Sequence, residues 1–238
     1  MLRFLRALAA NLLLLLALLL VYAGIVFAGV KWGATPREHV RADITFVFDT
    51  TGSMQDEING LLAISSRFAG KLAEHGVDCQ LSMVSFGGAD EPQPIRRTFG
   101  PSADVSAFQG FLRGIIAEGG GLEDQPRATR LAITNFTYRP NTHKMLILIT
   151  DERLLGDESY DPQGAPDARA QQALADWKEI TGQLVDENFT AYAVCIPVEY
   201  YQQIATRTGG KFYDIERGGD FTGIVMDIAE QINASLTR

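Results

Sequence analysis

The loop that follows the first apolar run after the N-terminus carries the residues best suited to chemistry. The stretch from Asp43 to Met54 reads DITFVFDTTGSM, and its apolar part ends at Asp49. Thr51 and Ser53 follow at every second position, so in an extended loop these three side chains can converge on one point. One carboxylate and two hydroxyls are oxygen donors, which a hard divalent cation such as Mg²⁺ prefers. Three donors leave an octahedral ion incomplete, so further ligands are expected elsewhere in the chain.

Alternating strands and helices are expected to position this loop. Strands are expected at 44–48, 78–86, 95–99, 144–150, 189–196 and 212–214. Helices are expected at 56–75, at 105–115 with Ser102 as the cap, at 127–136, from about 166 to 185, at 200–208 and at 221–236. This order predicts an α/β fold with a doubly wound, mostly parallel sheet and helices on both faces.

Ligand sites in such sheets lie at the carboxyl ends of strands, where the strand order reverses. Asp49 and Asp151 each follow a strongly apolar strand. If those two strands are neighbours in the sheet, the two carboxylates converge. The pattern therefore indicates Asp151 as a second acidic group for the same site.

A long apolar run near the N-terminus predicts a transmembrane helix before this domain. Residues 12–30 read LLLLLALLLVYAGIVFAGV without a charged residue, close to the ~20 apolar residues that span a bilayer. We expect a tail and anchor at 1–30, a tether at 31–41 and a folded domain at 42–238. A cleaved signal peptide, with a cleavage site at Val26-Phe27-Ala28, is the alternative.

Positive charges flank the apolar run almost equally, with Arg3 and Arg6 before it and Lys31, Arg37 and Arg41 after it. The tail before the run is short and its charges lie closest to the membrane. The positive-inside tendency then favours a cytoplasmic N-terminus. We therefore expect a single-pass membrane protein with an extracytoplasmic domain.

The rest of the composition narrows the class of partner. The formal net charge is -8, and no basic run follows the N-terminus, which argues against nucleic-acid binding. Cys79 and Cys195 lie in expected strands and lack the paired spacing of a zinc or redox motif.

Three loops in order give the chain a resemblance to the von Willebrand factor A-type domain, over about residues 42–236. The metal-ion-dependent adhesion site of this family begins with Asp-x-Ser-x-Ser. Asp49, Thr51 and Ser53 stand in these places, with Thr for the first Ser. The family's third loop reads Thr-Asp-Gly in many members, and Thr150-Asp151-Glu152 keeps the Asp and lacks the Gly.

The second loop carries the resemblance less directly. GGGLEDQPRA, which begins at Gly119, is similar to the GGGDxPE pattern of many bacterial members. The similarity places Asp124 as the ligand, two residues before Pro126, and leaves Glu123 as the alternative. It also points to a bacterial protein.

The resemblance implies a site for Mg²⁺, or for Mn²⁺ or Ca²⁺. The implied ligands are Asp49, Thr51, Ser53, Asp124 and Asp151, with Glu123 as the alternative to Asp124. In this family an open coordination place accepts a carboxylate from a partner protein, and most members are not enzymes. The resemblance therefore implies a membrane-anchored, metal-dependent module for protein binding and adhesion, with no catalytic residue.

Two other functions stay open. Some bacterial members of the family are accessory subunits of ATPase or chelatase-type machines. The second alternative is a metal-dependent hydrolase, since a bound metal can activate water. The family's sheet order also places the strands of Cys79 and Cys195 on opposite sides of the first strand. It thus implies two free, mostly buried thiols.

Overall fold

The computed structural model describes residues 19–20, 40–88, 93–120, 123–154, 168–216 and 220–236. The chain divides into two units, Met1–His39 and Val40–Arg238. The described residues contain no helix that combines the length and the apolar character of a membrane span. Most of the expected anchor and tether lies outside the described residues. The exceptions are Leu19 and Leu20, which are helical, and Val40 and Arg41, which begin the first strand.

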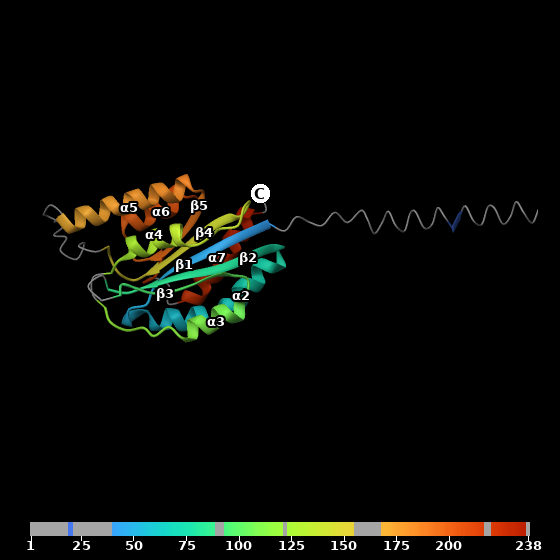
Figure 1. The fold of residues 1–238 in the computed structure, drawn as a ribbon, viewed down its shortest axis with the longest axis horizontal. Helices are drawn as coiled ribbons and strands as arrows, with labels where there is room; N and C mark the ends of the chain where they lie inside the picture. Colours follow the sequence, from blue (N-terminus) through green and yellow to red (C-terminus); the bar gives the residue numbers. More distant parts are fainter. Residues whose placement is uncertain are drawn as a thin grey trace, which may run out of the picture. The chain divides into compact units, whose positions relative to one another are not determined.

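Six strands among the described residues form one sheet, in the order β3-β2-β1-β4-β5-β6 (Figure 1). The strands are β1 (Val40–Asp49), β2 (Val77–Phe86), β3 (Ile95–Ser102), β4 (His143–Thr150), β5 (Phe189–Cys195) and β6 (Phe212–Asp214). Only β3 runs antiparallel to its neighbour; every other described pair is parallel. The chain leaves β1 toward β2 and later returns to β4 on its other side, so the strand order reverses between β1 and β4.

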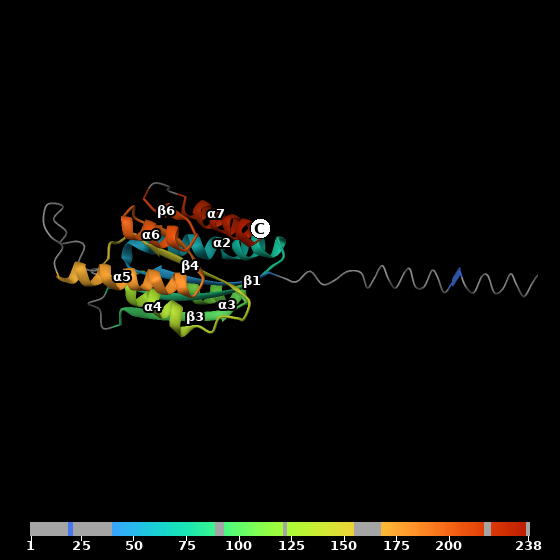
Figure 2. The same cartoon turned by 90° about the horizontal axis from the view of Figure 1, so that it is seen from above.

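Helices cover both faces of the sheet (Figures 1 and 2). They are α2 (Gln55–Glu74), α3 (Val105–Arg113), α4 (Gln125–Asn135), α5 (Ala168–Asp186), α6 (Glu199–Arg207) and α7 (Phe221–Leu236), with a 3-10 turn η1 (Gly52–Met54). One apolar core joins the sheet to α2, α3 and α7, and the other joins it to α4, α5 and α6. Adjacent β1 residues enter opposite cores, Phe46 the first and Val47 the second, because successive strand side chains alternate between faces.

These elements confirm the expected α/β architecture with a mostly parallel sheet. The expected cap of α3 is wrong, because β3 extends to Ser102 instead of ending at residue 99. Asp104 caps α3 instead, and its Oδ1 accepts from the backbone N–H groups of Ser106 at 2.9 Å and Ala107 at 3.0 Å. The Ser102 hydroxyl accepts from the Asp104 N–H at 3.0 Å and so supports the cap from the strand side.

The two cysteines are free thiols on opposite sides of β1, as expected. Cys195 on β5 is fully buried, whereas Cys79 on β2 is only partly buried. Burial raises the pKa of both thiols. Both therefore stay protonated near neutral pH.

Candidate metal centre

The first loop brings its three expected ligands together. Asp49 is the last residue of β1, and its carboxylate is fully buried. Its Oδ1 accepts two hydrogen bonds from Thr51, one from the backbone N–H and one from the hydroxyl, both at 2.8 Å. The Thr51 hydroxyl lies 3.5 Å from that of the exposed Ser53. One carboxylate and two hydroxyls therefore share one corner of the loop.

The third loop joins this corner because β4 pairs with β1. The Thr150 hydroxyl at the end of β4 donates to Asp49 Oδ2 at 2.8 Å. Asp151 follows directly, and burial together with the charge of Asp49 raises its pKa, against the effect of a hydrogen bond from Ser53. Its Oδ1 is buried and has no hydrogen-bond partner among the described residues.

The second loop contributes Glu123, which is 2 % exposed. Its Oε2 lies 3.3 Å from the Thr150 hydroxyl and 3.5 Å from Nε2 of Gln125. Burial raises the pKa of Glu123 strongly, and the adjacent Asp49 raises it further through hydrogen bonding and charge repulsion. Glu123 therefore lies inside the acidic cluster.

Asp124 makes a different contact. Its carboxylate accepts from the backbone N–H of Arg127 at 3.1 Å, at the start of α4. This is the contact of a helix N-cap, which satisfies an N–H group that the helix itself leaves unpaired. The structure thus brings together Asp49, Thr51, Ser53, Asp151 and Glu123, and it places the Asp124 carboxylate on the first turn of the helix.

The donor set fits a divalent cation. No ion pair between described residues reaches Asp49, Glu123 or Asp151. Buried carboxylates that repel one another are stabilised by a cation, and a hard cation prefers oxygen ligands. In the described ranges, His, Cys, Asp and Glu alone form no group of three suited to a metal ion. A cation here would therefore use the Ser and Thr hydroxyls as well.

Two neighbours of the cluster were not expected from the sequence. Glu57 in α2 has a pKa raised by burial, then by the charges of Asp151, Asp56 and Asp49, so it lies within electrostatic range of the site. It follows Ser53 by four residues, about one helical turn. Gln125 is fully buried and donates to the carbonyl of Arg153 at 3.1 Å as well as approaching Glu123. It thereby links the second loop to the third.

The whole domain can now be assigned to a class. Residues 43–224 match the family model of the von Willebrand factor type A domain, and the chain belongs to this family. No curated protein matches the sequence.

Solved structures share the fold at low sequence identity. The pilus adhesin SpaC from Lactobacillus rhamnosus GG is 14% identical with a TM-score of 0.59, over 84% of this chain and 31% of the adhesin. The minor pilin PilB from Streptococcus sanguinis is also 14% identical, with a TM-score of 0.55, over 85% of this chain and 64% of the pilin. Proximal thread matrix protein 1 from the mussel byssus is 15% identical with a TM-score of 0.53, over 82% of this chain and 46% of that protein. The chain thus spans about a third of the adhesin's length.

Proposed function

We propose that this protein is a membrane-anchored module that grips a partner protein through a bound divalent cation. The observation that carries the proposal is the acidic cluster where the strand order reverses, formed by the buried Asp49 and Glu123 and the half-buried Asp151. A binding site in a sheet of this type is expected at that position. Mg²⁺, or Mn²⁺ or Ca²⁺, would be held by these carboxylates and by the hydroxyls of Thr51 and Ser53, in part through water.

The chemistry of the ligands favours binding over catalysis. Hydroxyl groups are neutral, so they leave much of the cation's charge available to another ligand. A carboxylate of a partner protein is a hard oxygen anion and suits the remaining coordination place. The acidic groups in the cluster are themselves candidate ligands, so we assign no general base and no enzymatic role.

Membership in the von Willebrand factor type A family supports the proposal of protein binding. Two proteins of the same fold are named a pilus adhesin and a minor pilin, which agrees with an adhesive role. The apolar run at 12–30 supports anchoring in a membrane, and the charges around it support an extracytoplasmic domain.

The test is calorimetric titration of the full chain, purified in detergent, with Mg²⁺. Replacing Asp49 with Ala should abolish measurable binding while the fold is kept, because the residue ends a strand at the rim of the sheet. Asp186→Ala is the matched control, since it removes the same charge from an exposed position at the end of α5. Equal Mg²⁺ affinity for Asp49→Ala and the parent chain would falsify the metal site.

Protein binding is tested separately by pull-down. The full chain should retain a partner in Mg²⁺ and release it when a chelator is added, and the Asp49→Ala variant should retain none. Retention that ignores both the chelator and the variant would rule out a metal-bridged contact.

A further inference from the structure

A pocket of about 430 Å³ lies beside the metal loop. Its lining includes Thr50, Arg96, Arg97, Ile116 and Glu118. We propose that this pocket takes a second acidic side chain of the same partner protein, next to an apolar side chain that packs on Ile116. The inference rests on the proposed function, because the first carboxylate of the partner is the one that reaches the metal.

The pocket and the metal loop share a wall. Thr50 stands between the candidate ligands Asp49 and Thr51, and its hydroxyl donates to the carbonyl of Phe86 at 2.8 Å. The Thr50 carbonyl accepts from the backbone N–H of Glu118 at 3.2 Å and also from the Arg96 guanidinium. The pocket and the candidate metal loop therefore adjoin at Thr50, whose hydroxyl and carbonyl are both hydrogen-bonded.

The guanidinium groups of Arg96 and Arg97 are held in the pocket by contacts with nearby residues. Arg97 lies over the Phe111 ring, 4.7 Å from its centroid, and donates to the carbonyl of Gly114. Arg96 donates to the carbonyl of Glu118 at 2.6 Å. A Cβ at Gly114 would lie 2.6 Å from Nη1 of Arg97, and a Cβ at Gly87 would clash with Arg96. Both glycines thus leave the space that the arginines occupy.

The charge of the lining favours an anionic occupant. Arg97 is exposed, and no described residue forms an ion pair with it. The only carboxylate among the described residues that line the pocket is that of Glu118, so the exposed charge of Arg97 is the one that a ligand would meet. A guanidinium offers a planar set of N–H donors that pairs well with a carboxylate.

The exposed apolar side chain of the pocket, Ile116, indicates which kind of partner side chain lies beside the acidic one. Ile116 is 69% exposed, whereas the next most exposed large apolar side chains described in Val40–Arg238 are 38% exposed. Ile115 beside it is buried and also lines the pocket. An apolar side chain on the partner would cover Ile116, and an adjacent carboxylate would then reach Arg97. The expected recognition segment therefore carries one acid for the metal and an apolar–acid pair for the pocket.

Two synthetic peptides test this inference on the full chain in detergent with saturating Mg²⁺. The first is acetyl-Gly-Asp-Gly-Leu-Glu-Gly-amide, and the second has Gln in place of Glu. Fluorescence anisotropy of labelled peptides should show about fivefold tighter binding of the Glu peptide, the upper range for an exposed ion pair. In Arg97→Gln the two affinities should become equal. Arg113→Gln removes the same charge from an exposed position at the end of α3 and should keep the difference.

Ile116→Ser provides a second, independent variant, and it should weaken both peptides equally because both carry the Leu. Equal binding of the two peptides to the parent chain overturns the inference, and so does a difference that persists in Arg97→Gln. Absence of any peptide binding overturns it as well. The proposed function fails separately, if Mg²⁺ does not bind the full chain or if peptide binding ignores a chelator.

Discussion

Strand β1 buries two aspartates, one near its amino end and one at its carboxyl end, and their hydrogen-bond partners are opposite in kind. At the amino end, Asp43 is 2 % exposed and accepts from the backbone N–H and from Nε of Arg139, both at 2.7 Å. At the carboxyl end, Asp49 is fully buried and accepts from the hydroxyls of Thr51 and Thr150. One aspartate has a permanent cation beside it, and the other has only neutral donors among the described residues.

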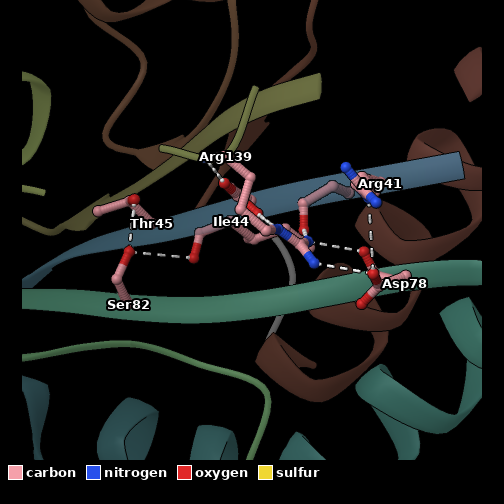
Figure 3. A network of polar contacts seen from close by, with 8 residues as sticks. Arg41, Ile44, Thr45, Asp78, Ser82 and Arg139 are labelled. Atoms are coloured by element: carbon pink, nitrogen blue, oxygen red, sulfur yellow. Dashed lines mark hydrogen bonds and ion pairs between the residues drawn. The ribbon is translucent and has the colours of Figure 1, made fainter. Parts of the chain in front are cut away.

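Arg139 reaches from the segment between α4 and β4 to both β1 and β2 (Figure 3). Its Nη1 donates to the Asp78 carboxylate at 2.8 Å and its Nη2 to the Asp78 carbonyl at 2.9 Å. Burial lowers the pKa of Arg139, but the hydrogen bonds to Asp78 and Asp43 outweigh it and raise the pKa. The charges at this end of the sheet are therefore balanced within the protein itself.

The difference separates a structural site from a binding site. A buried carboxylate with its own guanidinium needs nothing from outside. The carboxylates at the other end lack such a partner: the charge of Asp49 raises the pKa of Glu123 and of Asp151, and the group gains stability from any cation that binds there. The first end should therefore respond strongly to mutation, and the second should respond strongly to metal.

The largest effect is expected at the amino end. Arg139→Met should lower the free energy of unfolding by about 3–5 kcal/mol, because it leaves the buried Asp43 carboxylate without its cation. Urea denaturation of the full chain in a chelator measures this. The double variant Arg139→Met with Asp43→Leu should recover part of the loss. A loss below about 1 kcal/mol, the range of exposed ion pairs, would mean that the pairing is not structural.

Metal addition should act only at the carboxyl end. Mg²⁺ at one hundred times its dissociation constant should raise the free energy of unfolding by about 2.7 kcal/mol, because it binds the folded chain alone. The same denaturation curves in Mg²⁺ and in chelator measure the difference. Asp49→Ala should show no response to Mg²⁺, whereas Arg139→Met, if still folded, should keep it. Identical curves with and without Mg²⁺ in the parent chain would contradict the comparison.

The neighbours Glu123 and Asp124 sharpen the boundary of the metal site. Glu123→Gln should weaken Mg²⁺ binding about tenfold or more, equivalent to about 1.4 kcal/mol, because it removes a charged oxygen from the cluster. Asp124→Asn should leave the affinity unchanged, since Asn also serves as a helix cap. Calorimetry on the two variants decides which of the two carboxylates is the metal ligand. The reverse result would make Asp124 the ligand.

The smallest effects are expected on the free energy of unfolding when Glu123 or Asp124 is replaced with Ala. Asp124→Ala should cost about 1 kcal/mol of unfolding free energy in chelator, because the first turn of α4 loses its cap. Glu123→Ala should cost less in chelator, since removing one acid also relieves repulsion with Asp49. Thermal denaturation without metal measures both. Equal losses would show that the two carboxylates do not differ in role.

Much of the fold follows from local sequence patterns. The short apolar runs at 44–48 and 144–150 predict buried parallel strands, and the helical spacing after Asp56 predicts α2. The cap of α3 does not follow, because Ser102 and Asp104 are both good caps and the length of β3 decides between them. That length depends on pairing with β2, which is a long-range contact.

The candidate metal site, like the fold, is predictable in part from the sequence. The alternation of Asp49, Thr51 and Ser53, and the position of Asp151 after an apolar strand, follow from the sequence alone. The choice between Glu123 and Asp124 does not, because the two acids are adjacent and only the backbone direction at the start of α4 turns one inward and the other onto the helix. Thr150 is visible in the motif, but its bond to Asp49 requires β4 to lie beside β1.

The sequence by itself determined the order of strands and helices and the oxygen-rich loop at the end of the first strand, because both depend on residues close together in the chain. The tertiary structure decided which buried charges have partners. Arg139 and Asp43 are 96 residues apart and meet only when the sheet has formed. Asp49, Glu123 and Asp151 also meet only then, because three separate loops converge at one edge of the sheet.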